Sequence, residues 1–389
     1  MKLKHGLHLA YCTNIHRGES WAQTFGALKQ YTLRVRDRVS SRRPYAIGLR
    51  LGAEAARALS APAALKEFQH WLDRENCYVF TINGFPYGRF HGTRVKEQVY
   101  APDWTTRERL EYTNLLFDLL CQILPDGVSG SVSTVPVSFK EFVRNEEQVD
   151  AAAAKLWYCI EHIENLVSRT GKDLHLGLEP EPLCLLETSA ETVQFFERLR
   201  GQRPGDSRWE KRLGVNYDCC HLAVEFEPAH EALGRLRDNG IRLSKIHLSS
   251  ALRVQPTPEV RRALRNFADD IYFHQVIARR AEGDLQRYRD LDVALAAAER
   301  RPPAGEEWRI HFHIPLHSPT TPLYGNTQDH IAGVLEVVGT APGLCSHFEM
   351  ETYTWEVMPP ELKKRDVVDQ LVSEYEWTLA RLREVGLSE

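Results

Sequence analysis

The sequence predicts an α/β protein with a (β/α)8 TIM barrel, and three observations carry this prediction. Short runs of alternating apolar and polar residues are each followed by a longer stretch with helical periodicity, from one end of the chain to the other. Strand–helix–strand units of this kind imply parallel pairing with right-handed crossovers. No Gly-x-Gly-x-x-Gly follows the first run, which disfavours the alternative of a doubly wound, nucleotide-binding sheet.

Nine runs have the strand pattern, one more than a barrel needs. They span residues 7–14, 45–52, 78–84, 131–138, 174–180, 212–218, 242–249, 309–315 and 343–351. The interval 251–308 is charged and helical in character, so we assign it, with the run at 309–315, to an insertion at about 251–340, before the last barrel strand. The whole chain, 1–389, is expected to form one barrel domain that ends in a helix at about 360–386.

Helix ends can be placed between these strands. The pairs Thr105–Glu108 and Thr188–Glu191 have the spacing of capping boxes, in which side chains bond the free backbone amides of the first turn. Gly171 follows a helical stretch and is expected to end it, because glycine adopts the left-handed conformation at little cost.

Composition narrows the classes of function. A net charge of −4 and a pI near 6.5 leave no general cationic surface, which argues against nucleic acid as a partner. The eight cysteines include no Cys-x-x-Cys pair typical of structural zinc sites. The first residues, MKLKHGLHLAYCTN, are too polar for a secretory signal, and no apolar segment approaches a membrane-spanning length. We therefore expect a cytoplasmic protein without membrane insertion that handles a small-molecule metabolite.

The fifth predicted strand carries charged residues at its end. In the run 174–178 the leucines share one face, whereas Glu179 and Glu181 lie on the other. Pro180 and Pro182 cannot donate to a sheet ladder, so the strand stops where the carboxylates appear. In a barrel the polar face lines the interior, and strand ends of this kind carry the chemistry.

The later strands repeat this arrangement. Their polar faces carry Asp218 in the sixth run, His247 in the seventh, His311 and His313 in the eighth, and His347, Glu349 and Glu351 in the ninth. Buried carboxylates need raised pKa values or a compensating cation, and with imidazoles among them a divalent metal ion is expected. Ligands without cysteine suit Mn²⁺, Mg²⁺, Co²⁺ or Zn²⁺. The candidate ligands are Glu179, Asp218, His247 and either Glu349 or Glu351, with His221 of the Asp-x-x-His pair and His313 as additions.

Three loops at strand ends offer further contacts to a ligand. The candidates for substrate binding are Asn14, His16 and Arg17 after the first run, Tyr87, Arg89 and His91 after the third, and Trp355 after the last. An arginine in such a loop suits a phosphate or carboxylate group. The alternative is that these loops are turns whose aromatic residues pack over the barrel mouth or in the core.

At these residues the chain resembles the xylose-isomerase-like TIM-barrel superfamily of sugar isomerases, ketose 3-epimerases and endonuclease IV-type enzymes. The segments LGLEPEP, YDCCH, KIHLSS and HFEMETYTW resemble the ends of its fifth to eighth strands. The resemblance implies that Glu179, Asp218, His247 and Glu349 or Glu351 form the primary metal shell. It also implies that Glu179 and the last glutamate, Glu349 or Glu351, are catalytic and move a proton. In the endonuclease type, extra histidines build a multi-metal zinc site, and His221 and His313 leave that possibility open.

A narrower resemblance concerns the segments YCTNIHRGESW (11–21), HFHIPL (311–316) and ETYTWEVMP (351–359). They look like signatures of EboE, a family encoded in the bacterial Ebo gene cluster and described as metabolite-traffic proteins. The resemblance implies a role in the processing or export of a secondary metabolite, with other Ebo-cluster proteins as partners.

Three hypotheses for function follow. The first is a metal-dependent isomerase or epimerase acting on a small polar or phosphorylated metabolite, with the metal as Lewis acid and glutamates as acid and base. The second is a metal-dependent phosphoester hydrolase of the endonuclease IV type, which the many histidines favour. The third is a non-catalytic protein that binds a metabolite without converting it.

Overall fold

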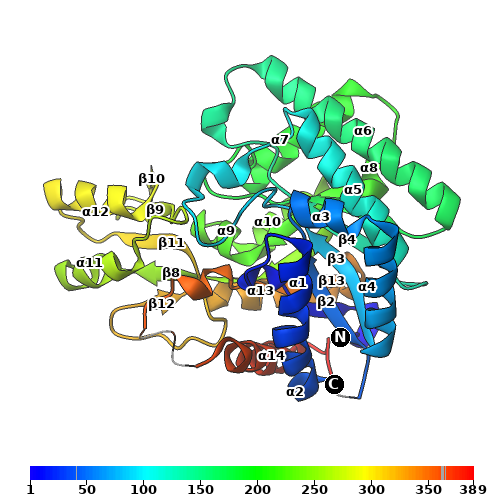
Figure 1. The fold of residues 1–389 in the computed structure, drawn as a ribbon. Coiled ribbons are helices and arrows are strands. Elements are labelled where there is room, and N and C mark those ends of the chain that lie inside the picture. Colours follow the sequence, from blue (N-terminus) through cyan, green and yellow to red (C-terminus); the bar gives the residue numbers. More distant parts are fainter. Residues whose placement is uncertain (41, 361–362, 364) are drawn as a thin grey trace.

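The protein is built around an eight-stranded parallel sheet that curls into a nearly closed barrel (Figure 1). The computed structural model describes residues 1–40, 42–360, 363 and 365–389. In sheet order the strands are β1 (His8–Tyr11), β13 (His347–Met350), β7 (Arg242–Leu248), β6 (Leu213–Asp218), β5 (Leu174–Leu178), β4 (Gly130–Thr134), β3 (Cys77–Asn83) and β2 (Tyr45–Arg50). A parallel bridge between Cys12 and Gly48 links the two end strands. The predicted (β/α)8 barrel is therefore confirmed.

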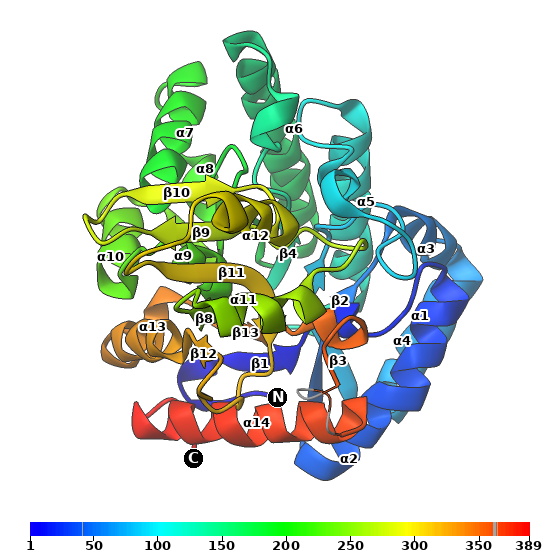
Figure 2. The same cartoon turned by 90° about the vertical axis from the view of Figure 1, so that its left-hand side faces the viewer.

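Helices surround the barrel and cover the apolar side of its strands (Figures 1 and 2). They are α1 (Trp21–Ala27), α2 (Leu33–Val39), α3 (Ala53–Leu59), α4 (Pro62–Arg74), α5 (Arg107–Ile123), α6 (Glu146–Thr170), α7 (Ser189–Gln202), α8 (Arg208–Arg212), α9 (Cys219–Val224), α10 (Ala229–Asp238), α13 (Gln328–Thr340) and α14 (Val367–Glu384). The core lies between strands and helices, where leucines such as Leu176 and Leu178 of β5 are fully buried. This leaves the polar face of each strand for the barrel interior.

Two of the predicted helix starts can be compared with the structure. The capping box at Thr188–Glu191 opens α7 as predicted, with both reciprocal hydrogen bonds present. The box predicted at Thr105 is wrong by one residue, because Thr106 caps α5 while the amide and hydroxyl of Thr105 both bond to Asp103. Gly171 ends α6 in the left-handed conformation, with φ of 72°, as predicted.

Between β7 and β13 the chain forms a second sheet that is antiparallel (Figure 2). Its strands, in sheet order, are β10 (Leu285–Tyr288), β9 (Val276–Arg279), β11 (Glu307–Ile314), β8 (Ser250–Val254) and β12 (Gly325–Asn326). The helices α11 (Pro258–Leu264) and α12 (Leu291–Arg300) accompany it and share its separate hydrophobic core. Figure 1 shows this part projecting to one side of the barrel, and we call it the insertion.

The expected interval 251–340 covers more than the antiparallel sheet. The sheet ends at Asn326, and the following helix α13 packs against α10 as a crossover helix of the barrel. The expected terminal helix at 360–386 corresponds to α14, and part of its expected start, residues 361–362 and 364, lies outside the described residues. Among the helices of the described ranges, none has both the length and the apolar character needed to cross a membrane.

A pair of glycine substitutions tests the close approach of β6 to β7. A Cβ at Gly214 in β6 would lie 2.3 Å from the carbonyl oxygen of Arg242, so Gly214→Ala should lower the free energy of unfolding by about 1–3 kcal/mol. Gly234 in α10 has open space around it, so Gly234→Ala should raise that free energy by about 0.5–1 kcal/mol. Urea denaturation of both variants measures the difference, and equal midpoints would contradict the proposed crowding.

Candidate metal centre

Four side chains from neighbouring strands converge at one end of the barrel. They are Glu179 after β5, Asp218 at the end of β6, His247 in β7 and Glu351 after β13. One ligand atom from each lies within 4.8 Å of the others, and all four residues are buried. The carboxyl ends of adjacent parallel strands meet at one edge, which explains why residues so far apart in sequence meet here. We call these four residues the metal group.

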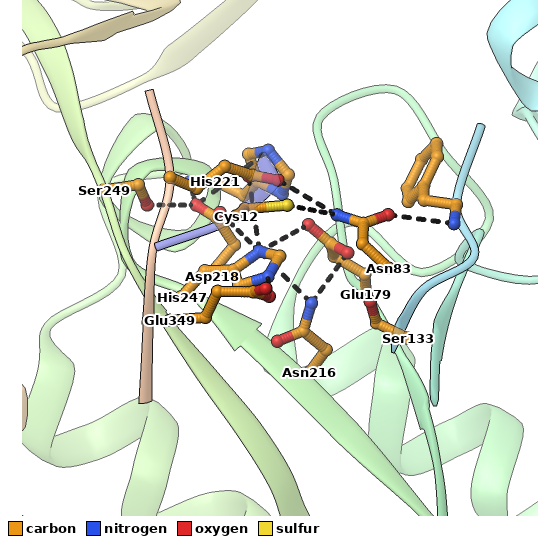
Figure 3. Close-up of polar contacts among 12 residues, drawn as sticks. Cys12, Asn83, Ser133, Glu179, Asn216, Asp218, His221, His247, Ser249 and Glu349 are labelled. Atoms are coloured by element: carbon orange, nitrogen blue, oxygen red, sulfur yellow. Dashed lines mark hydrogen bonds and ion pairs between the residues drawn. The ribbon is translucent and has the colours of Figure 1, made fainter. Parts of the chain in front are cut away.

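The metal group is centred on one imidazole nitrogen. Nδ1 of His247 lies 3.2 Å from Glu179 Oε1, 3.4 Å from Asp218 Oδ2 and 3.3 Å from Glu351 Oε2. Figure 3 shows Glu179 and Asp218 directed toward this imidazole. Asp218 Oδ2 is buried and forms no hydrogen bond, which is costly unless a cation binds there. The donor set therefore fits a divalent ion.

The other oxygen of each carboxylate is held by a neutral donor. These hydrogen bonds run from Asn216 Nδ2 to Glu179 Oε2 (2.7 Å), from Ser249 Oγ to Asp218 Oδ1 (2.7 Å) and from Asn14 Nδ2 to Glu351 Oε1 (2.8 Å). Donors of this kind fix the orientation of a carboxylate without neutralising its charge. One oxygen of each carboxylate is thus turned toward the common centre.

The electrostatics of the metal group favour a positive charge at its centre. Burial lowers the pKa of His247, but the carboxylates of Glu351 and Glu179 and the contact with Asp218 outweigh it and hold that pKa well above its usual value. Burial raises the pKa of Asp218, but His221 and His247 outweigh it and keep that pKa well below its usual value. The site is therefore suited either to a protonated imidazole or to a cation beside a neutral one.

Glu349 lies on the other side of His247, away from the common centre. Its Oε2 is 2.7 Å from His247 Nε2 and forms a fully buried ion pair with Lys245 Nζ. Burial raises the pKa of Glu349, but Lys245 and the bond to His247 lower it to about 2. A Cβ at Gly48 would lie 1.9 Å from Glu349 Oε1, so the absence of a side chain at Gly48 leaves the space that the Glu349 carboxylate occupies. Glu349 thus orients His247 so that Nδ1 faces the metal group.

Three further imidazoles adjoin the metal group. Each has its Nδ1 within hydrogen-bonding distance of a carbonyl oxygen: His221 with Pro180 O (2.9 Å), His311 with Gln275 Oε1 (2.7 Å) and His313 with Glu351 O (3.1 Å). Carbonyl oxygens only accept, so we assign a proton to Nδ1 in all three rings, which leaves Nε2 as the lone-pair atom of each neutral ring. Ligand histidines in metalloproteins are held in the same way.

The Nε2 atoms of these histidines lie close to one another and to Asp218. His221 Nε2 and His311 Nε2 are 3.0 Å apart, and His313 Nε2 is buried without a hydrogen-bond partner. Asp218, His221 and His313 form one possible ligand group, and Glu181, His221 and His311 form another. Sequence reasoning did not name His311 or Glu181 as ligands, although the alternation of the strands placed each on the same face as a named candidate.

A small cavity of about 60 Å³, open to solvent, lies above the metal group. Its polar lining comprises Asn14, Asn83, Lys96, Glu179, Glu181, His221, His311 and Glu351. Its apolar lining comprises Phe85, Pro86, Phe90, Val95, Val99, Tyr100, Tyr272, Phe273 and Tyr353. The aromatic residues come from the loop after β3, the insertion and the segment after β13, so the cavity is assembled from distant parts of the chain.

Of the loop residues expected to contact a substrate, Asn14 lines this cavity and His91 lies directly behind it. His91 Nε2 is 2.7 Å from the backbone oxygen of Asn14, and its side chain is buried. His16 bonds to the hydroxyl of Tyr11 and stacks on Tyr31. His91 therefore supports Asn14 from outside the cavity, and His16 faces another region.

The remaining four loop candidates lie away from the cavity. Arg17 is exposed and pairs with Glu356, and Arg89 is exposed. Tyr87 packs edge-on against Tyr112. Trp355 lines a separate hollow together with His16 and Arg17. These residues would need a different loop arrangement to reach a ligand at the metal group.

Comparison with solved structures shows the fold. The chain is similar to a xylose isomerase-like TIM-barrel protein from Mycobacterium smegmatis in complex with magnesium (TM-score 0.56, 14% identity, 99% of each chain covered). It is also similar to a D-tagatose 3-epimerase-like protein (0.54, 12% identity, 97% of each chain) and to an L-ribulose 3-epimerase (0.51, 12% identity, 97% of this chain and 95% of the other). No family model and no curated protein matches the sequence. These likenesses show the (β/α)8 barrel fold.

The ion pair beneath His247 can be tested by a double-mutant cycle. Lys245→Met should destabilise the protein by about 3–5 kcal/mol, because it leaves the buried Glu349 carboxylate uncompensated. Lys245→Met combined with Glu349→Met should recover most of that loss, because both charges are then removed. Urea denaturation of the single and double variants gives the coupling energy, and additive losses would contradict the pairing.

Proposed function

We propose that this protein is a metal-dependent isomerase or epimerase that acts on a small hydroxylated carbonyl compound. The observation that carries the proposal is the turning of three buried carboxylate oxygens toward one imidazole nitrogen at the carboxyl end of the barrel. The fold neighbours support it, since two of the three are described as an epimerase and an epimerase-like protein.

The residues that would hold the ion are those of the metal group. We assign Glu179 Oε1, Asp218 Oδ2, His247 Nδ1 and Glu351 Oε2 as ligand atoms, and we place Glu349 behind His247 as its positioning residue. Oxygen ligands with one imidazole suit Mn²⁺, Mg²⁺, Co²⁺ or Zn²⁺, and the magnesium-bound neighbour is consistent with this choice. A bound divalent ion would supply a Lewis acid for the substrate carbonyl.

Glu179 and Glu351 are placed to move the proton. They come from β5 and β13, which are separated in the sheet by β6 and β7, so they approach the centre from different strands. One carboxylate would take the proton from the carbon next to the carbonyl, and the other would return a proton to that carbon or to its neighbour. Asn216 and Asn14 hold the two carboxylates in place for this exchange.

A second candidate function is phosphoester hydrolysis with two or more metal ions. The specific observation in its favour is the set of imidazoles of His221, His311 and His313 beside Asp218, with His313 Nε2 buried and without a hydrogen-bond partner. A second ion there would share Asp218 with the metal group, as paired ions do in metal-dependent hydrolases. The number of bound ions separates this function from epimerisation.

A role in metabolite traffic and a non-catalytic role are two further alternatives that come from the sequence. The proposal of a role in metabolite traffic, with other Ebo-cluster proteins as partners, rests on the resemblance of three segments to EboE. A non-catalytic metabolite-binding protein would keep the same cavity and the same ion. It would differ from an enzyme in showing no proton exchange on any bound compound.

Metal content is the first test. Protein purified without added metal or a His-tag should carry about one Mn, Co, Zn or Mg ion per chain by plasma mass spectrometry. The variant Glu179→Gln/His247→Ala should lose it while keeping its circular dichroism spectrum. Glu231→Gln/His230→Ala on the exposed surface of α10 is the matched control and should keep it. Wild type without metal, even after addition of Mn²⁺ or Zn²⁺, would contradict the proposal.

Stoichiometry and exchange then separate the functions. An epimerase should incorporate deuterium from D2O into a ketose next to its carbonyl, observed by NMR, and Glu351→Gln should slow this at least about 100-fold. Two ions in the wild type, one of them lost in His221→Ala, would favour the hydrolase. Metal binding without exchange or hydrolysis across a metabolite panel would favour the binding protein.

A further inference from the structure

No lysine or arginine is free among the described residues that line the cavity above the metal group. Among the described residues that line it, Lys96 is the one lysine or arginine, and its Nζ lies 2.6 Å from Asp290 Oδ2 in a buried ion pair. Asp290 is itself fixed, because its Oδ1 accepts the backbone amides of His274 and Leu291 at the start of α12. The charge of Lys96 is therefore already paired with Asp290 of the insertion and is not available to a ligand.

Carboxyl groups dominate the polar lining of the same cavity. Glu179, Glu181 and Glu351 all line it, with Asp218 directly behind. One divalent ion would leave the three carboxylates of the metal group with a net negative charge, so a phosphate or carboxylate on the ligand would meet repulsion at short range. The two arginines expected to bind such an anion, Arg17 and Arg89, are exposed outside the cavity.

The polar end nevertheless offers an acceptor for a neutral donor. Asn14 Nδ2 donates to Glu351, which leaves Asn14 Oδ1 buried without a hydrogen-bond partner. A buried amide oxygen of this kind costs stability unless a donor reaches it. A hydroxyl group of a ligand bound at the metal group can donate to it, whereas an unprotonated phosphate oxygen cannot.

One wall of the cavity is aromatic and adjoins the histidines, because the ring centroids of Tyr353 and His313 are 4.7 Å apart. The rings of Phe90, Tyr272 and Tyr353 pack with centroid separations of 5.1 to 5.4 Å. The Tyr272 hydroxyl donates to the Phe90 carbonyl, and the Tyr100 hydroxyl donates to Glu181. The Tyr353 hydroxyl lies 3.4 Å from His311 Nε2. Because these hydroxyl groups already have partners inside the protein, the aromatic wall offers a ligand mainly ring surface.

Resting on the proposed function, we infer that the ligand of this site is an uncharged polyol or hydroxyketone that also carries an aromatic ring or a similarly flat apolar group. The hydroxylated end lies at the metal group and Asn14, and the flat group packs against the wall formed by Phe90, Tyr272 and Tyr353. Phosphorylated sugars are excluded from the site.

The test uses three matched probes on the metal-loaded protein: D-fructose, 1-O-benzyl-D-fructose and D-fructose 1-phosphate, with affinity measured by calorimetry. The benzyl ether should bind about tenfold more tightly than D-fructose, as expected for one aromatic stacking contact, and the phosphate should bind more weakly than D-fructose. Phe90→Leu should reduce the benzyl advantage to about twofold or less. Tyr158→Leu, at an exposed position of α6, should leave it unchanged.

Three results would overturn the inference: a benzyl ether that binds no more tightly than D-fructose, no detectable binding of the benzyl ether at millimolar concentration, or a phosphate that binds most tightly of the three. Loss of phosphate binding in Lys96→Met would then identify Lys96 as its partner. The metal content of the same samples separates this inference from the proposed function. A protein without metal overturns the proposed function, and the same probe series on that protein decides the character of the cavity.

Discussion

The contacts between His247 Nδ1 and three carboxylate oxygens impose a charge balance on the whole barrel interior. Buried carboxylates are stable only beside compensating charge and donors. The structure supplies the donors from Asn14, Asn216 and Ser249, and it supplies a further buried ion pair, Lys245 with Glu349, on the other side of the imidazole. A barrel interior is usually filled with apolar side chains. Here it can be polar, because each buried polar group is hydrogen-bonded to or charge-paired with its neighbour.

The insertion completes the site that the barrel begins. Along β11, Ile310, Phe312 and Ile314 enter the hydrophobic core of the insertion, while His311 and His313 face the barrel. Ion pairs hold this sheet in place, since Arg287 of β10 bonds to both Glu187 and Glu225 of the barrel. The insertion thus contributes imidazoles from β11 to the metal region, and Tyr272 and Phe273 from the segment before β9 to the cavity wall.

Strand periodicity predicted much of this arrangement, and its failures have physical causes. Alternation placed Glu179, Asp218 and His247 at one end of a barrel, where the structure brings them together. It could not choose between Glu349 and Glu351, because residues two apart share a face, and the choice depends on a lysine two residues before His247 on a different strand. The loop conformations were harder still to predict, because the directions of the Arg17 and Arg89 side chains depend on tertiary contacts that no local sequence pattern encodes.

The junction of β1 and β2 has a further consequence. β1 pairs with β13 along its whole length and β2 pairs with β3, but the two meet through the bridge of Cys12 with Gly48 and a bond from Arg50 N to Thr13. Gly48 also makes the space that Glu349 occupies. Local opening of the native state should therefore begin at this seam, and amide hydrogens on the seam side of β2 should exchange with solvent sooner than those of β5 and β6. Breathing of the seam would give water intermittent access to the deepest buried charges of the barrel.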